Sequence, residues 1–559
     1  MGWRRWEGNT LLLLSPVILL LAIFFALPLA RVLDASFGGS GPFTLDLYRK
    51  AVLGSIAQTW WEVTIEQTVI TTGLCLLLGY PVAYYLASST GRRRALILVA
   101  VITPLLMHFV AQTSVWRLIL GRRGWINEAL TGTGIIDDPL SILFSGIAVE
   151  IGLVQTLLPF MVVCIYAGMR GIPRAYMMVA NNLGAGPFRS FLRVYLPMSM
   201  PGVWAGILLV TVLTIGSFAA PDILGNTQHR GIASNLRGGG QFNSALAMVA
   251  LAGVLVLYLA FVRWVGFKPL YQAGEALTGL AGEEGVRRSK RRTLLGVGVG
   301  VICAYLLLPP ITVIILSFSR SSFVIFPPRE LTFRWYREYF TSADPLLDWI
   351  GSTVRSIEIG ALVALFSLAL GGVVSYALVR ARLPGKGILN GIMISPLVVP
   401  TVVTAGAIFH LYFYSTTLRH LLGTLPGMVL PHTVLALPYV IIVLTATLRN
   451  IDPIQEWVAL SLGANRWTTI RRILLPQMYP ALAIAGFLAF LVSFNEVIVA
   501  LMLKTRDYHT LPMNIWAGRT AEYGPMMAAV SALVLVGAAI LLGGAWCVRR
   551  RMGREVSGP

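Results

Sequence analysis

The sequence has 559 residues, of which 56% are hydrophobic and 12% are charged, and its formal net charge is +20. Its apolar surface exceeds what one core could bury, so the composition excludes an ordinary soluble protein and indicates a polytopic membrane protein. The basic residues lie in short clusters beside apolar runs, which is typical of membrane topology signals and not of a nucleic-acid-binding surface. We therefore expect membrane lipid, and no nucleic acid, as a partner of this chain.

Twelve apolar runs follow one another along the chain, and each is expected to cross the bilayer as a helix. The first, from Leu11 to Leu33, follows Arg4 and Arg5 like a signal peptide. It is of spanning length and has no clear cleavage site, so we interpret it as a membrane helix. The other runs are predicted near residues 64–88, 95–120, 142–168, 202–224, 244–266, 295–317, 353–379, 387–412, 426–447, 480–503 and 524–548.

Lysine and arginine set the expected orientation, because loops rich in these residues stay in the cytoplasm. Basic clusters occur at residues 92–94, 287–292, 380–382 and 549–551, and twelve helices place all of them on the same side as both termini. The pair Arg122 and Arg123 falls on the opposite side and does not fit this pattern. The sequence thus predicts that both termini are cytoplasmic.

The chain also contains an internal duplication. Residues 64–86 align without a gap on residues 356–378, an offset of 292, which places Gly79 on Gly371. A parallel duplication predicts a pseudo-two-fold axis along the membrane normal, with a pathway between the halves. We expect two six-helix halves of the same orientation, at residues 1–267 and 293–559, joined by a polar linker at residues 268–292.

A second repeated stretch lies between apolar runs, where residues 179–201 align without a gap on residues 458–480. Each copy is predicted to form a short helix, a glycine break, a basic amphipathic helix, and a proline that starts the next span. One such copy would suit a helix that only anchors the protein to lipid, but two superimposable copies favour a docking loop. The matched positions are Ala180 with Ala459, Gly184 with Gly463, Phe188 with Trp467, Phe191 with Ile470, Arg193 with Arg472, and Pro197 with Pro476.

This spacing resembles the "EAA" loop of the permease subunits of bacterial ABC importers, which docks into the ATPase subunits. The opening Glu-Ala-Ala of that motif falls on Met178-Val179-Ala180 and on Trp457-Val458-Ala459. Neither copy has the glutamate in register, although Glu456 lies one position early.

Further motifs narrow the resemblance. The first half, with the stretches at 124–127, 158–161 and 217–225, resembles one permease subunit of spermidine/putrescine-type importers. The second half, with the stretches at 432–439 and 493–500, resembles the partner subunit. The two are fused here, as in related ferric-iron importers. The resemblance implies an all-α, multi-pass protein of the bacterial inner membrane, with two type I importer permease halves. It implies a pathway for a polyamine, with ferric iron, thiamine or aminoethylphosphonate as alternative cargoes.

The sequence contains no GxxxxGK[ST] phosphate-binding loop, and the nearest stretch is Gly385-Lys386-Gly387. We therefore expect that the chain is not itself an enzyme and binds no cofactor. The resemblance implies two copies of a cytoplasmic ABC ATPase, which hold ATP and Mg and each grip one loop, and a periplasmic solute-binding protein. No metal site is expected, because the histidines lack metal-ligand spacing. A secondary transporter not driven by ATP is the alternative of another class, but it has no need of two matched loops.

Acidic residues within membrane runs are costly and tend to be functional, so they are the candidates for contact with cargo. Glu496 is the first candidate, because Ser493, Asn495 and Glu496 interrupt an apolar run where polyamine-type relatives have an acidic pair. The alternative is that such carboxylates pair with polar groups of neighbouring helices and never meet cargo. The remaining candidates are Asp222, Glu66, Glu150 and Glu358.

Overall fold

The computed structural model describes residues 4–39, 41–236, 240–266, 271, 291–321, 328–341, 348–381, 383–505, 508–517 and 524–556. Regular structure in these ranges is helical, apart from one isolated antiparallel bridge between Ser319 and Leu331. This confirms the predicted all-α class. Most of the predicted linker lies outside the described residues.

Nine helices within the described ranges are long and apolar enough to span a membrane. They comprise α1 and α2 (Arg4–Leu21 and Leu27–Ser36, joined by a π-helical turn), α4 (Ser55–Ala87), α8 (Gly146–Arg170), α11 (Leu196–Ile215), α14 (Gln241–Trp264), α16 (Arg291–Leu316), α18 (Trp349–Arg380), α21 (Leu425–Asn450) and α24 (Leu475–Asn495). The last predicted run coincides with α27 (Pro525–Val556), whose apolar part, Pro525–Ile540, is shorter.

The predicted runs at 95–120 and 387–412 are bent pairs of helices. In the first half, α5 (Gly91–Leu106) is bent by 101° from the stretch Phe109–Gly132, which begins with α6 (Phe109–Leu120). In the second half, α19 (Lys386–Val398) meets α20 (Thr401–Tyr414) at 94°. The second bend follows from Pro400, because a proline forces the preceding residue out of the helical region, and Val399 is extended. At the first bend, the side chain of His108 caps the new helix by accepting from the amide of Val110 at 3.3 Å.

Two further predicted runs are interrupted as well. Residues 202–224 were predicted as one run, but α11 ends at Ile215 and a short helix, α12 (Ala219–Leu224), follows. Residues 480–503 are likewise divided into α24 and α25 (Ile498–Leu503). Polar residues explain the second interruption, because the Glu496 side chain competes for backbone amides there.

The core of each half is a bundle of three helices, α4, α8 and α11 in the first and α18, α21 and α24 in the second. The duplicated glycines pack equivalently in the two bundles. A Cβ atom at Gly79 would lie 3.1 Å from Met161, and one at Gly371 would lie 2.7 Å from Val440. These two contacts occupy matching positions of the duplication, so the two bundles are built on the same plan.

The two halves exchange their first helices. The helices α1 and α2 pack against α18, α20 and α21 of the second half. The first helix of the second half, α16, packs in return against α4, α5 and α6. The predicted division at the linker therefore separates the sequence repeats, while each repeat contributes a helix to the other bundle.

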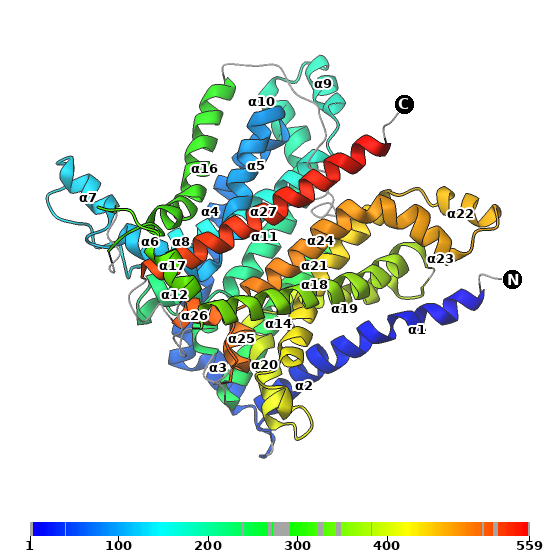
Figure 1. Ribbon diagram of the computed structural model, residues 1–559, viewed down its shortest axis with the longest axis horizontal. Helices are drawn as coiled ribbons and strands as arrows, with labels where there is room; N and C mark the ends of the chain where they lie inside the picture. Colours follow the sequence, from blue (N-terminus) through cyan, green and yellow to red (C-terminus); the bar gives the residue numbers. More distant parts are fainter. Residues whose placement is uncertain are drawn as a thin grey trace.

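The two ends of the molecule carry different elements. Helices α9 (Arg174–Asn182), α22 (Ile454–Ser461) and α23 (Arg466–Thr469) lie at the upper right of Figure 1, where both chain ends also lie. At the opposite end lie α3 (Asp46–Leu53), α7 (Trp125–Gly132) and α26 (Leu511–Ala517). The ends of the chain and the two repeated loops thus share one side of the molecule, and its cytoplasmic orientation stays a prediction.

Candidate functional site

The two repeated loops have the same backbone geometry. Helices α9 and α22 end at Asn182 and Ser461, and two residues further on Gly184 and Gly463 have φ angles of +84° and +87°. The amide of Ala185 donates to the carbonyl of Ala180 at 3.0 Å, and Ala464 donates in the same way to Ala459 at 3.0 Å. These bonds form a Schellman motif, in which a glycine with positive φ ends the helix and the chain reverses. The predicted helix break therefore lies at both glycines.

The second helix of each loop continues directly into the membrane span, which the sequence did not predict. In the first loop α10 (Pro187–Ser190) passes through a π-helical turn, η2 (Phe191–Tyr195), into α11, and in the second α23 passes through η6 (Ile470–Leu474) into α24. The amide of Leu196 donates to the carbonyl of Phe191, five residues back. Pro197 and Pro476 lie just beyond these turns and lack an amide hydrogen, so each interrupts the regular hydrogen-bond pattern where the helix widens.

The tip of each loop exposes large apolar side chains at matching positions. Leu183 is 82% exposed and its counterpart Leu462 is 83% exposed. Phe188 and Trp467 form a second exposed pair. Met178 with Trp457, and Val179 with Val458, complete this set, which we call the apolar tip. Exposed arginines, Arg193 and Arg472, lie one to two turns further on. Apolar groups exposed at matching places on both loops are typical of a surface that docks a protein partner.

Other predicted loop residues hold the loop to the membrane bundle. Phe191 lies edge-on to Tyr84 and to Tyr80, with ring centroids 5.7 and 6.1 Å apart. Its counterpart Ile470 packs with the small apolar cluster at the end of α21. Ala180 is half-buried and Ala459 is buried. These residues therefore support the loop from behind, while the apolar tip faces outward.

The four helix interruptions meet in pairs where the two halves touch. A Cβ atom at Gly216, after α11, would lie 3.5 Å from the Cβ atom of Pro400, between α19 and α20. The imidazole of His108, between α5 and α6, lies beside the backbone of Asn495, at the end of α24. We call these four residues the helix-break cluster. Each pair joins a bend of one half to an interruption of the other, so the arrangement repeats with the pseudo-two-fold symmetry.

An aromatic row extends from this cluster. The rings of His108 and Phe109 stack at 4.9 Å, Phe109 meets Phe218 edge-on at 6.1 Å, and Phe218 lies 5.0 Å from Trp516 of α26. The row thus begins in the first half and ends in the second. His108, Phe218 and Trp516 are buried, so in this conformation the row packs the two halves against each other.

Three predicted cargo residues of the second half, Ser493, Asn495 and Glu496, lie at the helix-break cluster. Ser493 is buried and its hydroxyl lies 2.9 Å from Nδ1 of His432. The Oε1 atom of Glu496 accepts from the amides of Ile498 at 2.8 Å and Val499 at 3.1 Å. Glu496 therefore caps α25 with one oxygen. The buried side-chain oxygen of Asn495 has no hydrogen-bond partner among the described residues.

The remaining acidic candidates are not gathered at this cluster. Asp222 is buried on α12 and pairs with Arg230, whose Nε atom lies 3.3 Å from Oδ1. Glu150 accepts from the hydroxyl of Thr71 at 2.7 Å. Glu66 and Glu358 are exposed at equivalent positions of α4 and α18. For Asp222 and Glu150 the geometry thus agrees with the alternative in which intramembrane carboxylates pair with neighbouring polar groups.

Comparison with known proteins defines the class of this chain. The model of the family "Binding-protein-dependent transport system inner membrane component" matches twice, at residues 76–267 and 368–554. The two matches begin at equivalent positions of the duplication. The chain belongs to this family, and it is a permease component of an ABC importer and a multi-pass protein of the inner membrane.

Individual relatives are permeases of one kind of system. The spermidine/putrescine transport system permease protein PotB of Escherichia coli K12 is 35% identical over 199 residues, which are 35% of this chain and 70% of that protein. PotB of Haemophilus influenzae is 35% identical over 215 residues, 38% of this chain and 73% of that protein. The permease protein PotC of Escherichia coli K12 is 29% identical over 248 residues, 44% of this chain and 89% of that protein. Similarity to both permeases agrees with two fused halves.

Proposed function

We propose that this chain supplies both permease halves of an ABC importer that takes up a polyamine such as spermidine or putrescine. The main support for an importer driven by an ATPase is the pair of repeated loops with matched apolar tips, because a symmetrical pair of docking surfaces suits two copies of one ATPase. In this scheme the ATPase copies hold ATP and Mg, and a periplasmic solute-binding protein delivers cargo. Closure of the ATPase pair moves the loops, and the helix bundles convert that motion into alternating access.

The cargo is proposed on separate grounds. The relatives named above are spermidine/putrescine permeases. The second half also places a carboxylate, Glu496, beside the helix-break cluster, from which the largely buried aromatic row extends. A protonated amine would be neutralised there. Ferric iron, thiamine and aminoethylphosphonate are the alternative cargoes.

Co-purification tests whether an ABC ATPase drives this permease. The chain is expressed with its genomic neighbours and purified from membranes in mild detergent, and an ABC ATPase is expected in a ratio of two copies per chain. Energy dependence gives a second readout, because uptake into vesicles should require internal ATP. Uptake that follows an ion gradient without ATP would identify a secondary transporter and overturn the proposal.

Thermal stabilisation of the binding protein tests the cargo. A ligand raises the unfolding temperature by an amount set by its concentration relative to its dissociation constant. The binding protein is heated with putrescine, spermidine, ferric iron, thiamine or aminoethylphosphonate. Stabilisation by a polyamine supports the proposed cargo. Stabilisation only by iron, thiamine or the phosphonate would keep the importer and replace its cargo.

A further inference from the structure

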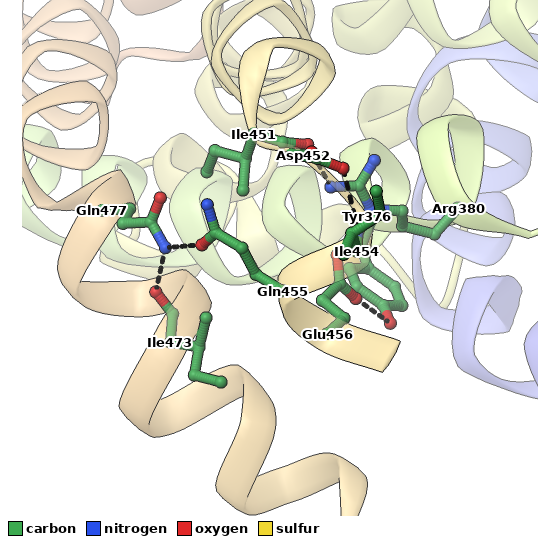
Figure 2. A network of polar contacts seen from close by, with 9 residues as sticks. All are labelled: Tyr376, Arg380, Ile451, Asp452, Ile454, Gln455, Glu456, Ile473 and Gln477. Atoms are coloured by element: carbon green, nitrogen blue, oxygen red, sulfur yellow. Dashed lines mark hydrogen bonds and ion pairs between the residues drawn. The ribbon is translucent and has the colours of Figure 1, made fainter. Parts of the chain in front are cut away.

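The second coupling loop is joined to the membrane bundle by a buried ion pair. The Nε atom of Arg380, at the end of α18, lies 2.7 Å from Oε1 of Glu456 in α22 (Figure 2). The side chains of Glu456 and Arg380 are only 9% and 14% exposed. The hydroxyl of Tyr376 donates to the other carboxylate oxygen of Glu456 at 3.3 Å. Both oxygens of this carboxylate thus bind side chains of α18.

Arg380 also reaches a third element. Its Nη2 atom donates to the carbonyl of Ile451, directly after α21, at 2.7 Å (Figure 2). One guanidinium therefore connects the ends of α18 and α21 to the coupling helix α22. We call these contacts of Arg380, Glu456 and Ile451 the arginine clamp.

A second polar contact fixes the other side of the same helix. The Nε2 atom of Gln477, in α24, donates to the side-chain oxygen of Gln455 at 2.7 Å and to the carbonyl of Ile473 at 2.9 Å (Figure 2). Helix α22 is consequently held to all three core helices of the second half.

The first loop lacks the clamp. The duplication places Ser88 where Arg380 stands and Met177 where Glu456 stands. Every described side chain of α9 is exposed or half-buried, whereas α22 buries Glu456 and Ala459. The first loop is tied to itself instead, because the hydroxyl of Ser190 donates to the side-chain oxygen of Asn181 at 2.8 Å. Its attachment to α4 is aromatic, through Phe191 and Tyr195 against Tyr84.

These two kinds of attachment transmit force differently. A buried ion pair with additional hydrogen bonds has a narrow range of favourable geometries, and removing one partner leaves an uncompensated charge. Aromatic rings keep favourable contact over a wider range of positions, since ring pairs attract at centroid separations of roughly 4.5–7 Å. A displaced α22 must therefore carry the ends of α18 and α21 with it, while no described side chain of α9 forms an ion pair that would carry α4 in the same way.

We propose that Arg380 and Glu456 are positioning residues for energy coupling, and that the arginine clamp makes α22 and the ends of α18 and α21 move as one body. The two coupling loops are thus mechanically unequal although their docking tips match. Two identical ATPase copies would meet one rigid and one compliant loop. This inference rests on the proposed function, because it requires that α22 docks an ATPase.

The test uses the complete complex of this chain, its ATPase and its binding protein in liposomes. The measured quantity is the uptake of radiolabelled spermidine per ATP hydrolysed. If another compound stabilises the binding protein, that compound replaces spermidine in the assay. We expect Glu456→Gln to lower this ratio about five-fold or more, the lower end of typical coupling effects. The matched control is Glu338→Gln, which breaks an exposed Arg334–Glu338 pair and should leave the ratio unchanged.

Three further variants separate coupling from mere stability. Arg380→Lys keeps a charge for Glu456 but not the forked donation to Ile451, so an intermediate ratio is expected. The charge swap R380E with E456R should recover part of the ratio lost in E456Q, because the ion pair is restored without the Ile451 contact. The pair S88R and M177E, which supplies the residue types of the clamp to the first loop, should keep or raise the ratio.

The outcomes distinguish this inference from the proposed function. If the wild-type chain brings no ATPase with it, the docking assignment itself fails. A second outcome is that the ATPase binds, but the uptake per ATP hydrolysed in both E456Q and R380K stays within about two-fold of wild type. This change is too small for typical coupling energies, so it would refute the role of the arginine clamp and leave the docking assignment standing. If E456Q does not accumulate, R380K decides, because it retains both charges: wild-type coupling in R380K then overturns the inference.

Discussion

The positive φ at Gly463 makes a quantitative prediction about the docking loop. Nothing lies within 4 Å of a Cβ atom placed there, so a substitution meets no steric obstacle and costs only the strain of the left-handed backbone. That strain is about 1–2 kcal/mol for an ordinary residue and up to about 3 kcal/mol for an unfavourable one. A β-branched side chain is the least compatible with this conformation, whereas asparagine tolerates it.

We therefore expect Gly463→Val to lower the equilibrium constant between the native and the rearranged loop by roughly 5–30-fold or more, since one to two kcal/mol changes an equilibrium constant by that factor. ATPase affinity should fall by up to the same factor, because docking selects the native loop. Gly463→Asn should bind nearly as wild type. The control is Gly186→Ala in the first loop, where φ is −62° and nothing lies within 4 Å.

The assay is the dissociation constant of the ATPase for the chain in nanodiscs, measured beside the yield and thermal stability of each variant. Wild-type affinity of G463V would show that the Schellman turn is not needed for docking. An equal loss in G463V and G463N would show that the glycine itself contacts the partner, and the backbone argument would then be wrong.

Three further predictions concern other sites. Leu462→Ser should weaken ATPase binding about ten-fold or more, because burying a leucine on docking is worth about 1.5–3 kcal/mol. Thermal stability should stay unchanged, since the side chain is 83% exposed in the free chain. Unaltered binding would show that Leu462 is not part of the docking surface. Glu496→Gln should slow uptake of a polyamine without changing assembly, as measured by initial rates and co-purification, and wild-type rates would make Glu496 a helix cap only. Gly168→Val should destabilise the first half by about 1–3 kcal/mol, because a Cβ atom there would lie 2.9 Å from the Gly202 backbone of α11. An unchanged melting temperature in detergent would contradict this close helix contact.

Local sequence patterns predict much of the fold. The apolar runs and the duplication predict the spans, and the contacts of Gly79 and Gly371 show that residues matched by sequence alone occupy matching places. The glycine breaks at Gly184 and Gly463 were also predictable, since only glycine readily adopts the required φ. The sequence predicted one continuous apolar run around Pro400 and not the sharp bend there. A proline within a span indicates either a hinge or a tolerated kink, and the sequence does not separate the two.

Contacts between distant residues could not be predicted in this way. Glu456 and Arg380 lie on different helices, and neither residue type indicates the other as its partner. A signal was present, because aligning the two loops shows an acid in the second copy where the first has Met177. For Glu496 the pattern indicated a functional acid, and the structure adds that one of its oxygens is already used to cap α25.

The exchange of first helices also constrains how the molecule is made. Helix α1 is synthesised before α18 and α21, which begin at Trp349 and Leu425 and carry the surfaces that α1 covers. Its apolar side chains must therefore stay in contact with lipid, or with the insertion machinery, while most of the chain is synthesised. The first bundle in turn is complete only after α16 of the second half has been made. Because both halves belong to one chain, they are also made in equal number.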